Sequence, residues 1–190
     1  MSDRPAARDR SEAALVAALV AAGCAAMLIR PALAPLPLAW RTTGLALVAG
    51  SILVAAVTMP VPRGVVRHVH ALPVLALGIV AVAVAATAVG PAIPVPWAAA
   101  ALPISFLAAV AEEALFRRTL YAALVPRGAL VAVAGSAVVF AAVHVPLYGW
   151  AALPVDLGAG LLFGWQRHAS GTWTVPAATH AFANLLAVMA

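Results

Sequence analysis

The sequence is poor in the charged residues that cover the surface of a soluble protein. None of its eleven basic residues is a lysine, and charged residues make up only 9% of the chain. An average soluble domain has about 25% charged and about 45–50% apolar residues, whereas 65% of this chain is hydrophobic. These proportions exclude an ordinary soluble fold, because a chain of 190 residues could not bury so much apolar surface.

Cysteine is scarce as well, since Cys24 is the single one and stands within an apolar run. One cysteine provides neither a disulfide framework nor a cysteine-based metal site. The net charge of +5 comes from scattered arginines, without the clustered basic stripe and interleaved aromatic residues of a nucleic-acid-binding surface. We therefore expect no nucleic-acid partner.

Long apolar runs, separated by short breaks rich in arginine, proline or glycine, make up most of the chain. A transmembrane helix needs about 20 apolar residues. The runs predict about seven spans, within a range of six to eight, at 13–29, 42–60, 71–90, 97–125, 128–147, 152–167 and 174–189. Their lack of a polar alternation favours helices over barrel strands. We predict an all-α polytopic membrane helix bundle, with residues 1–12 as a tail and 13–190 as one membrane domain.

The arginines indicate how this bundle is oriented. If the spans alternate in direction, every arginine except Arg30 and Arg41 lies on the side of the N-terminus. Loops rich in arginine usually face the cytosol. We therefore expect a multi-pass protein of the cell membrane with a cytosolic N-terminus, and the lipid bilayer is its first partner.

A small set of ionisable and amide side chains interrupts the later spans. Such groups normally serve a function in a membrane helix, since each is costly at depth unless it is paired or hydrated. The set consists of Glu112, Glu113, Arg117, His144, Asp156, His180 and Asn184.

Helix geometry gives the two adjacent acids different environments. Glu113 and Arg117 are i,i+4 neighbours in the favourable order of acid before base, so each can neutralise the other. Glu112 projects about 100° away around the helix and is left free to face a wet cavity. His180 and Asn184 are also i,i+4 neighbours and share a helix face.

Counting along the helices places the acids and histidines at one depth. At about 1.5 Å per residue, Glu112 and His144 both lie about 20 Å from the turn at Pro126, and His180 reaches the same level if these helices extend beyond the bilayer. The count predicts one site on three helices below the arginine-rich face. Asp156 can belong to this site or cap the start of the sixth span.

Three short motifs carry these residues: Glu112-Glu113-Ala-Leu-Phe-Arg117, Phe140-Ala-Ala-Val-His144 and His180-Ala-Phe-Ala-Asn184. Their order and spacing resemble the CAAX prenyl endopeptidase and bacteriocin-processing (CPBP, or Abi) family of intramembrane proteases. The resemblance covers about residues 97–190, which would form the protease-like core. The first three spans contribute nothing to it.

The resemblance implies an intramembrane endopeptidase that hydrolyses a peptide or membrane-protein substrate. In that family pattern Glu112 activates a water molecule and Asn184 stabilises the oxyanion. His144 and His180 are placed around the reacting carbonyl. A desolvated glutamate is a competent base, and an amide donor in a low dielectric favours negative charge on oxygen. No residue indicates that the substrate is prenylated.

The resemblance also admits a metallopeptidase mechanism, in which Glu112, His144 and His180 hold a zinc ion that activates the water. The sequence does not choose between the two, because the His-x-x-x-Asn motif lacks the second histidine of HExxH. In either mechanism Glu113 and Arg117 are supporting residues.

Two other functions compete with a protease. The first is a non-proteolytic membrane partner or bacteriocin-immunity-type protein that retains the same polar core. The second is a small transporter that uses Glu112 and His144 as a proton relay. A relay needs a path along the first three spans, and the predicted spans there contain no ionisable residue.

Overall fold

The computed structural model describes residues 4–61, 71–89 and 98–189, and this part of the chain is helical without strands. It confirms the predicted all-α bundle. The long helices are α1 (Arg4–Met27), α3 (Leu38–Thr58), α4 (Ala71–Val89), α5 (Ala98–Glu113), α7 (Ala129–Tyr148), α8 (Leu153–Ser170) and α9 (Thr174–Met189). The π-helix η2 (Ala114–Leu120) and α6 (Tyr121–Leu124) continue α5 without a break. The short helices α2 (Arg30–Leu33), η3 (Val125–Arg127) and η4 (Trp150–Ala152) lie in the connections.

These helices lie where the apolar runs predict them, with one clear difference at the start. The first helix begins at Arg4, so α1 includes most of the predicted tail. Its apolar part extends through α2 to Leu33 rather than ending at residue 29, and therefore includes Arg30. Two predicted breaks, at 60–70 and 90–96, lie mainly outside the described residues.

Glycines at both ends of α7 set its length. Gly128 and Gly149 have φ angles of 111° and 82°, which L side chains rarely adopt. Gly128 is the N-cap residue and Gly149 the C-cap residue of α7, and neither has helical backbone angles. As a result α7 begins and ends sharply, and the position of His144 near its C-terminal end is well defined.

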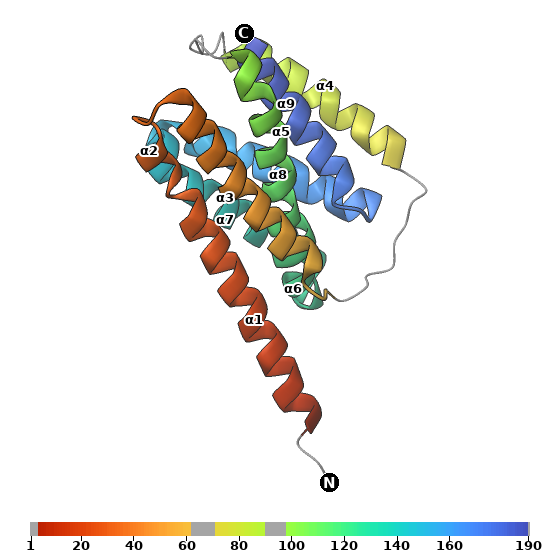
Figure 1. Ribbon diagram of the computed structural model, residues 1–190. Helices are drawn as coiled ribbons and strands as arrows, with labels where there is room; N and C mark the ends of the chain where they lie inside the picture. Colours follow the sequence, from red (N-terminus) through yellow and green to blue (C-terminus); the bar gives the residue numbers. More distant parts are fainter. Residues whose placement is uncertain (1–3, 62–70, 90–97, 190) are drawn as a thin grey trace.

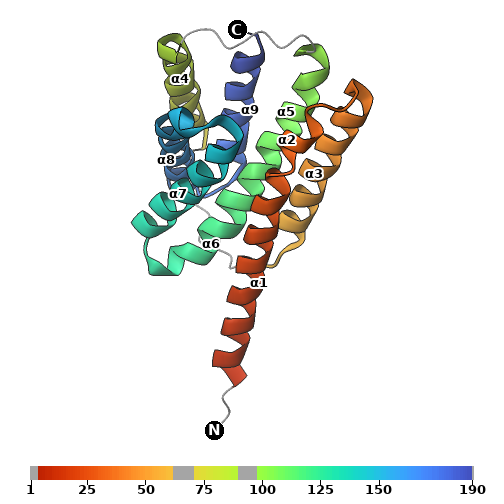
Figure 2. The ribbon, with the colours of Figure 1, turned by 90° about the vertical axis from the view of Figure 1, so that its left-hand side faces the viewer.

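The bundle is built around α5, which packs against α3 on one side and α9 on another (Figure 1). Helix α7 packs along α8, and α4 lies against α8 and α9. The start of α1 extends beyond the other helices, at the opposite end of the molecule from the end of α9 (Figure 2). The later helices thus enclose α5 at the level of its acidic residues.

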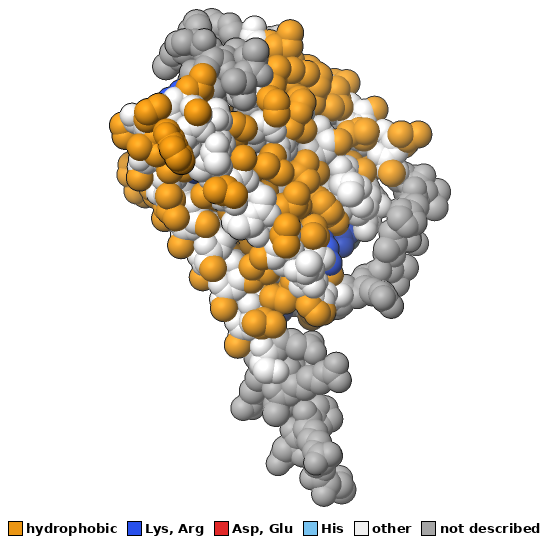
Figure 3. All heavy atoms as spheres, in the orientation of Figure 1, with side chains coloured by type: hydrophobic (Ala, Val, Ile, Leu, Met, Phe, Trp, Pro, Cys, Tyr) orange, Lys and Arg blue, Asp and Glu red, His pale blue; other side chains and the backbone are white. Residues whose placement is uncertain are grey.

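The outer surface is apolar, as in a membrane protein. Large hydrophobic side chains point outward, with Leu130, Leu72 and Leu47 exposed by 81%, 78% and 69%. The face in Figure 3 is mainly hydrophobic, with few arginines and no acidic side chain visible among its described residues. Four described helical segments are long and apolar enough to cross a membrane: Ala13–Leu33, Leu38–Thr58, Ala71–Ala88 and Ala129–Tyr148. The chain is therefore a membrane protein, while the number of crossings and the cytosolic N-terminus stay predictions.

Glycine allows α7 and α8 to approach each other closely. A Cβ atom added at Gly160 would lie 2.9 Å from the Cα atom of Ala137, which is too short for any real contact. Gly164 is similarly close to Val133. Small residues at helix contacts are the usual means of close packing in membranes. In α8 they also expose the Gly160 carbonyl to the centre of the bundle.

We predict that Gly160→Ala lowers the stability of the protein by about 1–3 kcal/mol, because the added methyl group meets backbone atoms of α7 that cannot rotate away. Thermal unfolding in detergent measures this. Gly158→Ala is the matched control on the same helix, since a Cβ atom there meets nothing within 4 Å. The control should be neutral or slightly stabilising. Equal unfolding temperatures for the two variants would contradict the proposed close approach.

Candidate active site

One carboxylate oxygen of Glu112 faces both histidines of the predicted site. Its Oε2 atom lies 3.7 Å from Nε2 of His144 and 3.8 Å from Nε2 of His180. The three side chains come from α5, α7 and α9, and all are buried. The structure therefore brings together the three residues for which the helix count predicts a common level.

The other nitrogen of each histidine is already bonded. His144 Nδ1 lies 2.7 Å from the carbonyl oxygen of Phe140, and His180 Nδ1 lies 3.0 Å from Oε1 of Glu113. Since both partners are acceptors, each Nδ1 carries the hydrogen and donates it. In the neutral rings each Nε2 then presents a lone pair toward Oε2 of Glu112. Three acceptor atoms thus face one another, and a water molecule or a cation between them satisfies this arrangement.

Aromatic rings hold the two imidazoles in place. The His144 ring lies between Phe140 and Tyr148, with ring centroids 4.4 Å and 5.6 Å away. The His180 ring stacks on Phe163 at 5.0 Å. These contacts and the Nδ1 hydrogen bonds leave each ring one orientation.

The predicted pair of Glu113 and Arg117 lies at the centre of the bundle. Arg117 Nη1 is 3.3 Å from Oε1 of Glu113, and neither side chain is exposed. Arg117 Nη2 donates a hydrogen bond of 3.0 Å to the Gly160 carbonyl of α8. The guanidinium also lies 4.7 Å from the ring centre of Phe140, at a distance that favours a cation–π contact. Glu113 therefore links this cation to the hydrogen bond that orients His180.

The helix changes from α to π directly after the acidic pair. Within the π-helix η2, the Arg117 carbonyl accepts a hydrogen bond of 3.0 Å from Nε of Arg167. Short π segments inside α-helices often occur at functional sites. The apolar pattern of the predicted span 97–125 does not indicate this π-helix.

Arg30 is the residue that the sequence analysis missed. Its Nη1 donates a hydrogen bond of 2.9 Å to Oε1 of Glu112, and the two charges form an ion pair. The expectation that Glu112 stays free of a partner is therefore wrong. Arg30 was placed in a loop on the face opposite the site, but α2 brings it to the carboxylate. The available signal was that Arg30 is the one charged residue between Glu12 and Arg41 in the sequence.

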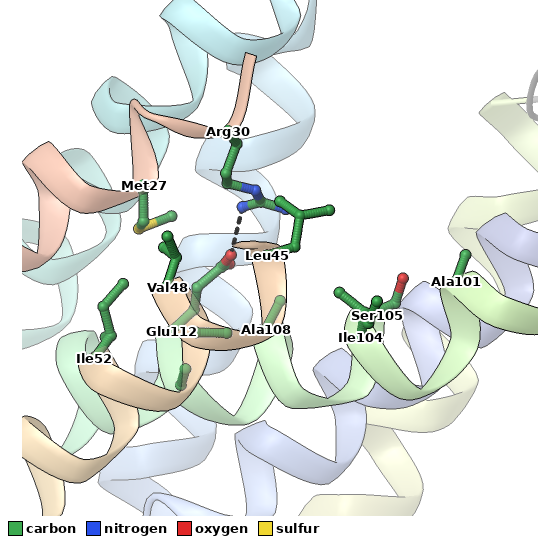
Figure 4. A pocket seen from close by; sticks show the side chains of 12 residues that line it. Met27, Arg30, Leu45, Val48, Ile52, Ala101, Ile104, Ser105, Ala108 and Glu112 are labelled. Carbon is green, nitrogen blue, oxygen red and sulfur yellow. Dashed lines mark hydrogen bonds and ion pairs between the residues drawn. The ribbon is translucent and has the colours of Figure 1, made fainter. Parts of the chain in front are cut away.

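The expected cavity beside Glu112 is present. It has a volume of about 210 Å³ and is lined mainly by apolar side chains of α1, α3 and α5, and the Arg30–Glu112 pair forms part of its wall (Figure 4). Its wall includes Met27, Leu45, Val48, Ala49, Ile52 and Ile104. The cavity can therefore receive an apolar group next to a carboxylate that faces two histidines.

Asn184 and Asp156 lie farther from the centre. The amide nitrogen of Asn184 donates to the Ser105 carbonyl at 3.0 Å, and Ser105 lines the cavity. Asn184 thus lies at the border of the cavity and has a second N–H for another acceptor. Asp156 does not cap α8, whose N-cap residue is Ala152, and its charge lies close enough to interact with His144 and Glu112.

The donor chemistry of Glu112, His144 and His180 fits a zinc ion. Two imidazole Nε2 atoms and one carboxylate oxygen face one another, and both Nδ1 atoms make the hydrogen bonds that metal-binding histidines usually make. As the side chains stand, no group of three His, Cys, Asp or Glu residues in the described part of the chain has the geometry of a metal site. An ion would therefore have to draw these atoms closer together.

Comparison with protein families identifies the matched range of the chain. Residues 94–186 match the model of a family described as type II CAAX prenyl endopeptidase Rce1-like. A search of curated proteins and a search of solved structures each found no match. The matched range contains Glu112, Glu113, Arg117, His144, His180 and Asn184. The family resemblance of the three motifs is confirmed, and the family implies a protease.

We predict that Glu113→Gln lowers the stability by about 3–5 kcal/mol, because it leaves the buried charge of Arg117 without a counter-charge. Arg117→Met should cost a similar amount for the opposite reason. The double variant Glu113→Gln/Arg117→Met removes both charges and should recover a large part of the loss. Unfolding in detergent measures all three variants. Losses that simply add up would show that the two side chains do not interact.

Proposed function

The chain belongs, through residues 94–186, to the Rce1-like family of type II CAAX prenyl endopeptidases, and we propose that it is an intramembrane endopeptidase whose Glu112 activates water. One observation carries this proposal: Oε2 of Glu112 faces the Nε2 atoms of both histidines at 3.7 and 3.8 Å. A water molecule held among these atoms can donate its hydrogens to two of them. Such a water is oriented for attack on a carbonyl carbon, and Glu112 accepts its proton.

The histidines act beside the reacting carbonyl. Each imidazole keeps its Nδ1 proton on a fixed partner and offers Nε2, so it can accept a proton from the water or return one to the leaving amine. Because the rings are held by stacking, these transfers need no rotation of the side chains. His144 and His180 therefore position the water and move its protons.

Asn184 supplies the stabilisation of the oxyanion in this proposal. Its amide is attached to the cavity wall through the Ser105 carbonyl, and the second N–H remains for the substrate oxygen. A fixed donor in a site that excludes much of the water is worth more than in bulk solvent. A substrate carbonyl at the end of the cavity lies between Asn184 and Glu112.

The substrate is a peptide or membrane protein with an apolar group beside the bond that is cut. The cavity of about 210 Å³ is lined mainly by aliphatic side chains, and the charged residues in its lining are Arg30 and Glu112. Burial of an apolar side chain or lipid group in such a cavity contributes about 25 cal/mol per Å². The free energy gained by burying this apolar group holds the scissile bond beside Glu112.

A zinc ion held by Glu112, His144 and His180 would act as a Lewis acid and lower the pKa of a bound water. The supporting observation is the inward direction of the three donor atoms. In that case Glu113 would retain its role of fixing the His180 tautomer.

The non-proteolytic alternative also has an observation in its favour. Several polar side chains of the site are bonded within the protein, since Glu112 pairs with Arg30 and Asn184 donates to the Ser105 carbonyl. A packing core in a partner or immunity protein would look the same. Activity decides between the two functions.

We expect purified protein in detergent or vesicles to cleave members of a library of membrane peptides, detected by mass spectrometry. Glu112→Gln should lower the rate by about 10²–10⁴-fold, because it removes the base. Val138→Ala, an exposed position on the outer face of α7, is the control and should cut at the wild-type rate.

The same cleavage assay with and without a chelator tests whether the reaction needs a metal ion. Loss of cleavage on chelation, restored by added zinc, supports the metallopeptidase form, and unchanged cleavage supports water activation by Glu112 alone. No cleavage by folded wild-type protein over the whole library would favour the non-proteolytic function.

A further inference from the structure

The N-terminal region reaches the active carboxylate through one side chain. Arg30 begins α2, far outside the residues that match the protease family, yet its Nη1 lies 2.9 Å from Oε1 of Glu112. Glu112 is 6% exposed at its side chain and Arg30 is 26% exposed. The pair therefore joins a nearly buried acid to a cation at the edge of the cavity.

Because of this contact, the two carboxylate oxygens of Glu112 have different partners. Oε1 accepts the hydrogen bond from Arg30, and Oε2 remains for the Nε2 atoms of His144 and His180. The last side-chain torsion of a glutamate is broad and roughly two-fold, so an unrestrained carboxylate samples many orientations. With Oε1 bonded, the carboxylate plane is fixed and Oε2 keeps facing the histidines.

Charge balance gives a second reason for the contact. Glu113 has Arg117 as its counter-charge, and neither histidine has to be charged in the hydrogen-bonding scheme of the site. Arg30 supplies the matching positive charge for Glu112. An isolated carboxylate at this burial would be strongly disfavoured.

We propose that Arg30 is a positioning residue for Glu112, supplied by the N-terminal helices and not by the matched protease domain. Its hydrogen bond to Oε1 keeps Oε2 of Glu112 directed at the reacting water. This role rests on the proposed peptidase function. Arg30 also lines the cavity, but in this role it acts through Glu112.

The kinetic test compares Arg30→Gln, Arg30→Lys and Arg41→Gln on a peptide that the wild-type protein cuts. Arg30→Gln should lower kcat by about 10²-fold, as expected for a displaced catalytic group, and change KM by less than about twofold. Arg30→Lys keeps the positive charge, and its kcat should be at least about tenfold higher than that of Arg30→Gln. Arg41→Gln is the control, because Arg41 donates to the Ala34 carbonyl at the start of α3 and should leave kcat unchanged.

Peptides with a free and an amidated C-terminus distinguish positioning from substrate binding. If Arg30→Gln raises KM only for the free carboxylate, Arg30 binds the substrate and the proposal is overturned. An unchanged kcat in Arg30→Gln also overturns it. If the wild-type protein cuts nothing, the peptidase function and this role fail together.

The pair itself is tested without activity by a cycle of unfolding temperatures. Arg30→Gln should lower the unfolding temperature in the wild-type background and lower it much less in a Glu112→Gln background, where no carboxylate remains to be paired. Equal shifts in both backgrounds would show that Arg30 and Glu112 do not interact, and would overturn the proposal whatever the activity of the protein.

Discussion

The buried ion pair of Glu113 and Arg117 is the interaction on which the remaining structure depends. Arg117 reaches the Gly160 carbonyl of α8, and Glu113 accepts the Nδ1 hydrogen of His180 on α9. Three helices are thereby tied to one fully buried point, inside a ring of phenylalanines. The glycine at position 160 belongs to the same arrangement, because only a residue without a side chain lets α8 come near enough for its carbonyl to be reached.

Glu112 and Glu113 are adjacent and chemically identical, but their surroundings give them different roles. Glu113 is enclosed and has its charge fully matched by Arg117, so it is a structural anion. Glu112 lies one position earlier in the helix, in the wall of a mainly apolar cavity, and keeps one oxygen directed at the histidines. About 100° of helix rotation is enough to produce this difference.

Much of the fold could be predicted from the sequence, because lipid requires helices and apolar runs of a certain length mark them. The approach of Glu112 to His144 could also be predicted, because counting helix rise puts both at the same distance from one turn, whereas His180 needed the further assumption that these helices extend beyond the bilayer. Arg30 could not be found in this way, since its contact depends on how the chain places α2 beside Glu112, and local spacing rules apply only within one helix. The π segment could not be predicted for a similar reason, because the Arg117 carbonyl within it is bonded by Arg167 of α8, which is distant in sequence.

The residues that line the cavity come from two regions of the sequence. Glu112 lies on α5 within the range that matches the family, whereas Met27, Leu45 and Ile52 come from the first helices of the chain. Substitutions at these three positions change the shape of the cavity without touching Glu112 or the histidines. If the protein is the peptidase proposed above, its choice of substrate can therefore change through the first helices alone, while the groups that act on the scissile bond stay as they are.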